Sequence, residues 1–390
     1  MRVGVYDRYW RTAGGGEQFA GGIAQALAGD HEVDLLGPDA VDFSYLRERL
    51  GLDLSRTRHR LVSDDDSISR ASAGYDLFVN CTYLSPVVNR ATCGLYVVHF
   101  PGLPESPHGK RRRQFRSATA RVLAMSPTLP THLARVRDDW MPATGGADFL
   151  ASYTRVVANS AFTARWIERL WGIDAEVLYP PFMTRDGANS HELRKPIVLS
   201  VGRFIDRRIG HCKKQLELVH AFRALHDSGR APGWELYLVG GCEPANRDYA
   251  MQVKAAAAGY PIHVLLNAPG SVLRDLFDTA SIFWHGAGLG EDEEKNPDLF
   301  EHFGISVVEA MAAGIAPVVF GAAGPAELVR DGLDGLQFRS VGELVDRTAG
   351  LVADPVRRSM LGAAAAERAE DFGFDSFRLR VGALVADLVA

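Results

Sequence analysis

The sequence predicts an α/β protein of two domains, each built on a parallel sheet with helices on both faces. The chain has 390 residues, more than one ordinary hydrophobic core accommodates. Short apolar runs alternate with amphipathic stretches along both halves, and this alternation is typical of parallel sheets. A polar stretch between Met183 and Lys195 separates the two series of strands. We therefore place the domain boundary there.

The first half opens with a strand and a glycine-rich turn. Gly14, Gly15 and Gly16 let the backbone turn tightly before a predicted helix. Phe19 occupies the position of the third glycine in a dinucleotide fingerprint, which argues against a nicotinamide or flavin site. His99 emerges near the end of an apolar strand, before a Pro-Gly break. The predicted strands of this half are residues 2–6, 32–36, 76–81, 95–100 and 155–158.

The second half begins with a strand at residues 197–201 that ends in Gly202 and Arg203. A loop leads to Lys213 and Lys214, directly before an amphipathic helix. An arginine and a lysine at a strand-to-helix crossover place positive charge near a helix N-terminus, which suits a diphosphate. Further strands are predicted at residues 235–240, 262–266, 282–284 and 316–320, and the last helices at 341–352, 355–370 and 374–389.

The most informative stretch lies between the strands predicted at residues 282–284 and 316–320. A Gly-rich, acidic loop is followed by a helix predicted from about residue 304 to 313. The N–H groups of Gly304, Ile305 and Ser306 would face the carboxyl end of the sheet with positive dipole, which favours a phosphate. Glu301 and Glu309, with seven residues between them, flank this anion site. A carboxylate accepts two hydroxyl hydrogen bonds at once.

Composition narrows the class of protein. The content of 47% hydrophobic and 23% charged residues is that of a soluble globular protein, and the net charge of -5 argues against a general nucleic-acid binder. Without an apolar run of membrane-spanning length or a signal peptide, the expected location is the cytoplasm. The four cysteines form no C-x-x-C pair, which favours reduced thiols, and no spacing of ligands predicts a metal site.

The segment from Glu301 to Gly314 resembles the E-x(7)-E signature of retaining glycosyltransferases of family 4, the glycosyl transferases group 1, which have the GT-B fold. The resemblance implies two Rossmann-like domains facing a central cleft. It also implies that Glu301 contacts hydroxyls of the donor sugar and that Glu309 holds the ribose. Gly15 and Gly16 match a Gly-Gly turn of that family close to the donor diphosphate.

Three further positions follow from the same resemblance. The run His99-Phe100-Pro101 is similar to that of the mannosyltransferase-like branch, in which the histidine lies near the reacting sugar. Arg203 matches an arginine that neutralises the diphosphate together with a lysine. Because the loop before the lysines is longer than the short form, either Lys213 or Lys214 fits that role, and we favour Lys213.

The resemblance therefore implies a hexosyltransferase that moves a sugar from a GDP- or UDP-sugar to a hydroxyl or amine, with retention and a same-face internal return. It implies no metal or cofactor beyond the nucleotide sugar. The acceptor is expected in residues 1–182, the donor in residues 196–372, and residues 373–390 form a helix that crosses back to the first domain. The acceptor stays open among small molecules, glycolipids and polysaccharides. The high Ala, Arg and Gly content is that of a GC-rich bacterial genome.

Residues 103–150 form an irregular insertion, which we interpret as an acceptor-side loop or helical pair. Its basic cluster is either a solvated helix face or a contact for an anionic acceptor or membrane surface. The cluster comprises Lys110, Arg111, Arg112, Arg113 and Arg116.

Other functions remain as alternatives at this point. A nucleotide-sugar 2-epimerase would share the architecture, and so would a non-catalytic nucleotide-binding protein. A glycosidase fits less well, because its two carboxyl groups must face one glycosidic bond. The nucleotide base, the sugar, the pathway and the oligomeric state are left open.

Overall fold

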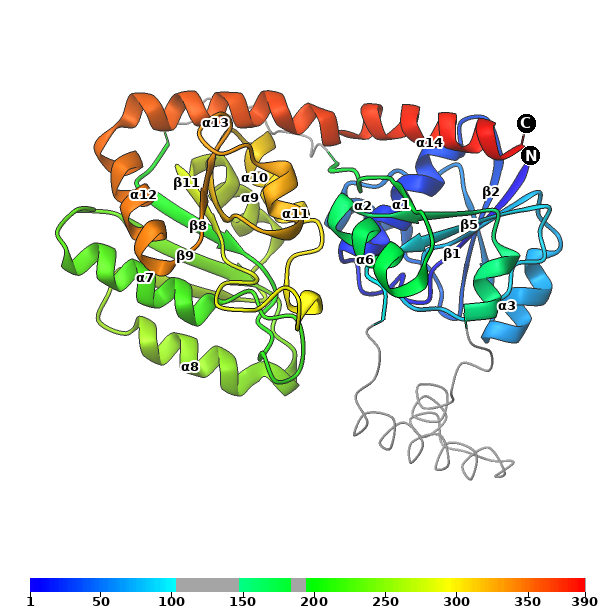
Figure 1. Ribbon diagram of the computed structural model, residues 1–390, viewed down its shortest axis with the longest axis horizontal. Coiled ribbons are helices and arrows are strands. Elements are labelled where there is room, and N and C mark those ends of the chain that lie inside the picture. The colour runs from blue at the N-terminus through cyan, green and yellow to red at the C-terminus, as the bar shows by residue number, and fades with distance from the viewer. Residues whose placement is uncertain (103–146, 184–193, 390) are drawn as a thin grey trace.

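The computed structural model describes residues 1–102, 147–183 and 194–389, and it contains two α/β domains lying side by side (Figure 1). Every strand of the first sheet runs parallel to its neighbours, in the order β3-β2-β1-β4-β5-β6-β7. These strands are β1 (Arg2–Tyr6), β2 (Glu32–Gly37), β3 (Arg58–Leu61), β4 (Leu77–Asn80), β5 (Cys93–Val98), β6 (Arg155–Ala158) and β7 (Glu176–Val177).

The helices of the first domain follow the strands in sequence, as expected for parallel connections. They are α1 (Gly15–Leu27), α2 (Phe43–Leu50), α3 (Asp65–Ser72), the 3-10 turn η1 (Ala147–Ser152) and α6 (Ala161–Trp171). Gly15 and Gly16 thus form the first turn of α1 rather than a loop before it. The basic cluster predicted at residues 110–116 lies outside the described residues.

The second sheet is also parallel throughout, in the order β10-β9-β8-β11-β12-β13. Its strands are β8 (Ile197–Val201), β9 (Glu235–Gly240), β10 (Ile262–Leu266), β11 (Ile282–His285), β12 (Ala316–Phe320) and β13 (Leu336–Phe338). Its helices are α7 (Gln215–Asp227), α8 (Arg247–Ala257), α9 (Gly270–Thr279), α10 (Ile305–Ala312), α11 (Ala323–Leu328), α12 (Val341–Ala353) and α13 (Pro355–Ala369). Short 3-10 turns occur at η2 (Pro244–Asn246), η3 (Pro297–Leu299) and η4 (Glu370–Phe372).

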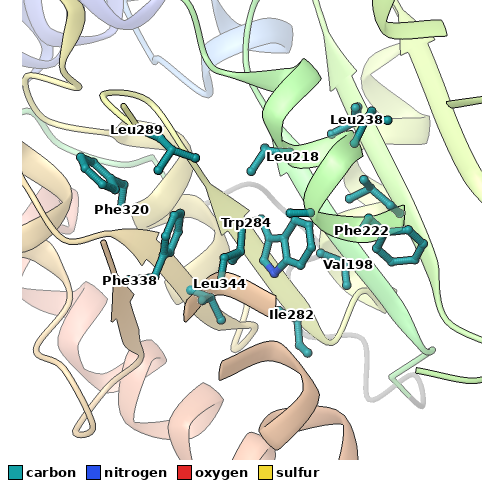
Figure 2. Packing of buried hydrophobic residues seen from close by; sticks show 14 of the residues in the cluster. Val198, Leu218, Phe222, Leu238, Ile282, Trp284, Leu289, Phe320, Phe338 and Leu344 are labelled. Carbon is teal, nitrogen blue, oxygen red and sulfur yellow. The ribbon is translucent and has the colours of Figure 1, made fainter. Parts of the chain in front are cut away.

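Trp284 of β11 lies at the centre of the core on one face of the second sheet (Figure 2). Its ring packs edge-on against Phe222 of α7, with ring centroids 6.1 Å apart. Its indole nitrogen donates to the hydroxyl of Thr348 in α12 at 3.0 Å. A buried indole N–H needs such a partner, and this bond fixes α12 against the sheet. The packing therefore holds β11 rigidly at its carboxyl end, where the candidate site begins.

The last helix, α14 (Phe374–Val389), belongs to the first domain by its contacts. In Figure 1 it continues the line of α13 out of the second domain and lies along the first. Phe377 packs edge-on against Phe19 of α1, with ring centroids 6.0 Å apart. The side chains of α14 that join the core of the first domain are Phe377, Val381, Leu384, Val385 and Leu388. No helix of the described residues is both long and apolar enough to cross a membrane.

One predicted strand is shifted. We predicted a strand over residues 95–100, whereas β5 begins at Cys93 and ends at Val98. The strand ends there because the carbonyl oxygen of His99 does not pair with a neighbouring strand. It accepts a hydrogen bond from the side chain of Asn159 at 3.0 Å instead. His99 therefore stands just beyond the sheet.

Candidate active site

Glu301 is the centre of a charged cluster at the carboxyl edge of the second sheet. One of its oxygens, Oε2, accepts a hydrogen bond from Lys213 Nζ at 2.5 Å and another from His285 Nε2 at 2.8 Å. His285 is the last residue of β11, and Lys213 stands two residues before α7. The Glu301 side chain is 13% exposed and that of Lys213 20%, so the ion pair is largely shielded from water. Three segments that are distant in sequence thus converge on one carboxylate.

The electrostatics of this cluster favour an ionised Glu301. Burial raises the pKa of its carboxyl group, but the charge of Lys213 and the hydrogen bond from His285 outweigh burial and bring the pKa well below the usual range. Because an ionised carboxylate only accepts hydrogen bonds, Nε2 of His285 must carry a proton. The other ring nitrogen, Nδ1, is buried and has no hydrogen-bond partner among the described residues.

Two more histidines, His211 and His302, lie near the cluster, and the rings of both are neutral. Burial, followed by the nearby charge of Lys213, brings the pKa of His211 well below its usual value. Burial likewise lowers the pKa of His302 to about 3. The ring of His302 stacks on Phe100 of the first domain, with centroids 4.2 Å apart and planes 10° from parallel. The His302 ring therefore forms part of the contact between the domains.

Arg203 is placed by tight packing at the ends of β8 and β9. The side-chain amide of Gln215 donates to the carbonyl oxygens of Gly202 at 3.2 Å and Arg203 at 3.1 Å. A Cβ atom on Gly240 would lie 1.9 Å from the oxygen of Gly202, so only glycine lets the two strand ends approach this closely. Arg203 itself is exposed, and it stands at the same sheet edge as Lys213.

Helix α10 begins where the sequence predicted an anion site. Gly304 precedes it with φ 108°, a conformation that side chains rarely permit. No side chain of the described residues caps this helix, so its first amides, including those of Ile305 and Ser306, remain for another acceptor. Glu309 lies one turn further along α10 and is half-buried.

The first domain presents its predicted residues to this edge. A Cβ atom on Gly15 would lie 3.0 Å from Cδ1 of Ile305, across the domain boundary. A Cβ atom on Gly16 would lie 3.6 Å from the His99 ring. Nε2 of His99 donates to the carbonyl oxygen of Cys81 at 2.8 Å, and burial lowers its pKa, so the ring is neutral.

Glu17 of α1 also stands at the boundary. Its carboxylate accepts a hydrogen bond from the Gly14 amide at 2.6 Å, which stabilises the first turn of the helix. Burial raises the pKa of Glu17 above its usual value, although the Gly14 amide and the charge of Arg203 in the other domain act in the opposite direction. The field of Arg203 therefore reaches the first domain.

The two candidate lysines are in different environments. Lys213 pairs with Glu301, whereas Nζ of Lys214 binds Glu291 at 2.6 Å, where both side chains are at most 5% exposed. Arg207 binds the same carboxylate through two hydrogen bonds of 2.5 and 2.6 Å. Lys213 thus lies with the predicted donor residues, and Lys214 belongs to a separate buried network.

Sequence reasoning missed His285 and Glu291. His285 is the polar residue at the end of an apolar strand, at the carboxyl edge of a parallel sheet. The same pattern singled out His99. That pattern could have found His285. Glu291 stands in a loop of several acidic residues, and nothing in that pattern distinguishes it from its neighbours.

Comparison with known proteins shows what parts of the chain resemble in sequence. Residues 184–368 match the family described as Glycosyl transferases group 1. A GDP-Man:Man(3)GlcNAc(2)-PP-Dol alpha-1,2-mannosyltransferase of Dictyostelium discoideum is 30% identical over an alignment of 188 residues that covers 44% of this chain and 35% of that protein. The protein of the same name from Xenopus laevis is 27% identical over 183 residues, 44% of this chain and 34% of that one. This chain therefore spans about a third of the length of these relatives.

Solved structures resemble the whole chain. HepE of Anabaena in complex with UDP has a TM-score of 0.68 at 17% identity, with 100% of both chains covered. Sucrose-phosphate synthase of Thermosynechococcus elongatus has a TM-score of 0.67 at 18% identity, covering 100% of this chain and 99% of that one. WaaG, a glycosyltransferase involved in lipopolysaccharide biosynthesis, has a TM-score of 0.56 at 14% identity, with 97% of each chain covered. At such identities the likeness concerns the fold, and it confirms the predicted fold class. The chain has the GT-B fold of these structures, and its second domain matches the glycosyl transferases group 1.

Proposed function

We propose that this protein is a retaining glycosyltransferase that uses a nucleotide-sugar donor. The observation that carries the proposal is the convergence of Lys213, His285 and Glu301 beside the uncapped end of α10. This arrangement combines a fixed cation, helix amides and an ionised carboxylate at one sheet edge. A diphosphate needs the first two, and the hydroxyls of a sugar suit the third.

In the proposed complex the donor lies along the carboxyl edge of the second sheet. Lys213, Arg203 and the amides of Ile305 and Ser306 hold the diphosphate. Glu309, further along α10, binds the ribose hydroxyls. Glu301 accepts hydrogen bonds from the sugar hydroxyls, and its ion pair with Lys213 orients both groups before the donor arrives.

The proposed chemistry is a same-face internal return. The bond between the anomeric carbon and the diphosphate oxygen breaks, and Lys213, Arg203 and the α10 amides stabilise the negative charge on the leaving group. An oxygen of that diphosphate takes the proton of the acceptor hydroxyl or amine. The acceptor then bonds to the anomeric carbon on the face that the diphosphate left, so the configuration is retained. His99 binds a donor-sugar hydroxyl in this scheme.

We propose a GDP- or UDP-sugar as donor and place GDP-mannose first. The relatives named for a GDP-mannose reaction are up to 30% identical over less than half of this chain, whereas the UDP-bound structure is 17% identical over the whole chain. The acceptor would lie against the first domain, and it is a small molecule, a glycolipid or a polysaccharide. The dolichol-linked acceptor in the relatives' names makes a glycolipid a first class to test.

A thermal-shift titration tests donor binding. The purified protein is heated with GDP, UDP, ADP or TDP, with and without EDTA, and Glu309→Ala is treated in the same way. A ligand at a hundred times its dissociation constant stabilises a protein by about 2.7 kcal/mol. We expect one nucleotide to raise the melting temperature, to do so equally in EDTA, and to lose most of its effect in the variant. The absence of a shift with every nucleotide would count against the proposal.

Product analysis tests the reaction itself. Each donor is incubated with the protein and a panel of methyl glycosides and lipid-linked acceptors, and the anomeric protons are followed by NMR. We expect release of the nucleoside diphosphate and a new glycosidic bond with the donor's configuration. An inverted product would overturn the mechanism, and conversion of the donor into its 2-epimer would replace transfer with epimerisation.

A further inference from the structure

Glu327 belongs to the second domain, yet its carboxylate binds the first. Its side chain extends from α11 to the amino end of α6, where Oε2 accepts from the Ala161 amide at 2.9 Å and Oε1 from the Phe162 amide at 2.6 Å. The hydroxyl of Tyr179 donates to Oε2 at 3.1 Å. All three donors lie in the segment that ends the first domain.

These bonds satisfy a requirement of α6. The first amides of a helix have no partner within the helix, and a carboxylate at that end also meets the positive end of the helix dipole. The side chain of Ser160 accepts from the amide of Thr163 at 3.0 Å and so caps one of the first three amides. Glu327 caps the other two. The amino end of α6 is therefore complete only when the second domain lies against it.

The residues around the Glu327 carboxylate are mostly apolar, and the low local dielectric strengthens its hydrogen bonds. The ring of Phe162 stacks on His302, with centroids 6.2 Å apart, and lies 6.4 Å from Phe300. Tyr179 stacks on Phe303 at 5.8 Å. At the exposed rim Arg169 of α6 pairs with Glu294 at 2.6 Å. Exposed pairs of this kind contribute little, so Glu327 is the main polar link.

Glu327 connects the two halves of the candidate site through short paths. On the first-domain side, the hydroxyl of Thr163 in α6 donates to the carbonyl oxygen of His99 at 3.4 Å, next to the bond from Asn159. On its own side, the amide of Gly324 in α11 donates to the carbonyl oxygen of Glu301 at 3.0 Å. The helices that Glu327 joins are thus the helices that hold His99 and Glu301.

We propose that Glu327 is a positioning residue that clamps α11 to α6 and thereby sets the separation of His99 and Glu301 across the domain boundary. Its effect on catalysis rests on the proposed glycosyl transfer, whereas its effect on the domain arrangement does not. The residue touches neither donor nor acceptor in this scheme. Removing the clamp should widen the range of domain orientations and slow transfer, while the donor site within the second domain stays intact.

The test measures domain separation and donor binding on the same variants. Glu327→Ala removes both acceptors, Glu327→Gln keeps one carbonyl oxygen, and Tyr179→Phe removes one donor but keeps the ring. Glu343→Ala is the matched control, because the Glu343 carboxylate caps the Arg339 amide at 2.7 Å entirely within the second domain. Spin labels replace two exposed residues, Tyr45 in α2 and Met360 in α13, after the half-buried Cys93 and Cys242 are changed to serine.

For Glu327→Ala, pulsed EPR should show a broader and longer distance distribution than for wild type. The kcat for transfer should fall by roughly ten- to a hundredfold, and the dissociation constant of the nucleoside diphosphate should change less than about twofold. Glu327→Gln and Tyr179→Phe should lie between Glu327→Ala and wild type, and Glu343→Ala should match wild type in both measurements.

An unchanged distance distribution in Glu327→Ala would overturn the clamp even if transfer is established. If Glu327→Ala does not fold, unchanged distances and kcat in both milder variants would overturn it as well. A protein that shows the EPR change but binds no nucleotide would retain the clamp and refute the proposed function. A fall in affinity equal to the fall in kcat would show that Glu327 acts on the donor site and not on domain position.

Discussion

At the residue scale, the two adjacent lysines show how sequence neighbours acquire different tasks. Lys214 has φ 61° and directly precedes α7, so its side chain turns away from that of Lys213. Lys213 reaches Glu301 across 88 positions of sequence, and Lys214 reaches Glu291. The sequence left this choice open, because the left-handed turn at Lys214 is dictated by the packing around it and not by a glycine.

Replacing each lysine in turn tests the assignment. Lys213→Met should weaken nucleoside diphosphate binding by about ten- to a hundredfold, because a charge-assisted hydrogen bond contributes about 1.5–3 kcal/mol. Lys214→Met should leave that affinity within about twofold of wild type but destabilise the fold by roughly 3 kcal/mol, since Glu291 loses a buried partner. Calorimetric titration and urea unfolding measure the two quantities. The opposite pattern of affinities would reassign the diphosphate to Lys214.

The Glu291 network predicts a pH dependence of stability. Hydrogen bonds from Arg207, together with Lys214, lower the pKa of Glu291 from 4.5 to about 2. A group with a depressed folded pKa contributes stability above its unfolded pKa and loses it as the pH falls toward the folded one. The melting temperature of Glu291→Gln should therefore be lower than that of wild type at pH 7. This difference should decrease as the pH falls from about 4.5 to about 2. Glu48→Gln, at an exposed position of α2, is the control and should show no gap.

Other features of the cluster could not be read from the sequence. The predicted helix placed Glu301 before its start and Glu309 within it, and α10 has the same arrangement. The ionisation of Glu301, however, depends on His285 at the end of β11 and on Lys213 in the loop before α7. Such convergence is a property of the sheet order and appears only once the strands are arranged.

At the scale of elements, glycines decide how closely the strand ends approach. Gly240→Ala should destabilise the second domain by about 1–3 kcal/mol, because its methyl group would overlap the Gly202 carbonyl oxygen and displace Arg203. Nucleoside diphosphate affinity should fall as well. A Cβ atom on Gly350, in the interior of α12, would meet no atom of a neighbouring element within 4 Å. Gly350→Ala should therefore stabilise the second domain by about 0.5–1 kcal/mol. Equal stability of the two variants in urea unfolding would contradict this account.

The last helix offers a second test at this scale. Phe377 is 1% exposed and packs on α1, whereas Leu379, two residues along the same helix, is 69% exposed. Phe377→Ala should destabilise the first domain by about 3–5 kcal/mol, and Leu379→Ala should change stability by less than about 0.5 kcal/mol. Unfolding followed by circular dichroism gives both values. A small effect of Phe377→Ala would show that α14 is not part of that core.

Most elements followed from periodicity, and the exceptions have physical causes. Strands such as Arg2–Tyr6 and Ala316–Phe320 were predicted with their observed limits, because buried parallel strands are short apolar runs with sharp ends. The end of β5 was misplaced because Phe100 is an apolar residue beyond the last strand residue, Val98. The Phe100 ring is buried against His302 of the other domain, so its apolar character serves the interface and not the sheet.

At the scale of the whole molecule, the domains share more than a linker. Phe100, Phe162 and Trp166 of the first domain belong to the same hydrophobic cluster as Trp284 of the second. Helix α14 adds a second connection on the side seen at the top of Figure 1. The order of elements in the sequence predicted two domains, and the family resemblance implied the crossing helix. Neither could predict this shared cluster, since interface residues look like core residues in sequence.

The central claim is that the donor diphosphate binds between Lys213 and the amino end of α10. The most direct measurement is a crystal structure of the protein with the nucleoside diphosphate selected by the thermal-shift titration. The account predicts phosphate oxygens within about 3 Å of Lys213 Nζ and of the Ile305 and Ser306 amides, with the ribose at Glu309. A nucleotide bound elsewhere, with the ion pair between Lys213 and Glu301 unchanged and no phosphate beside α10, would contradict it.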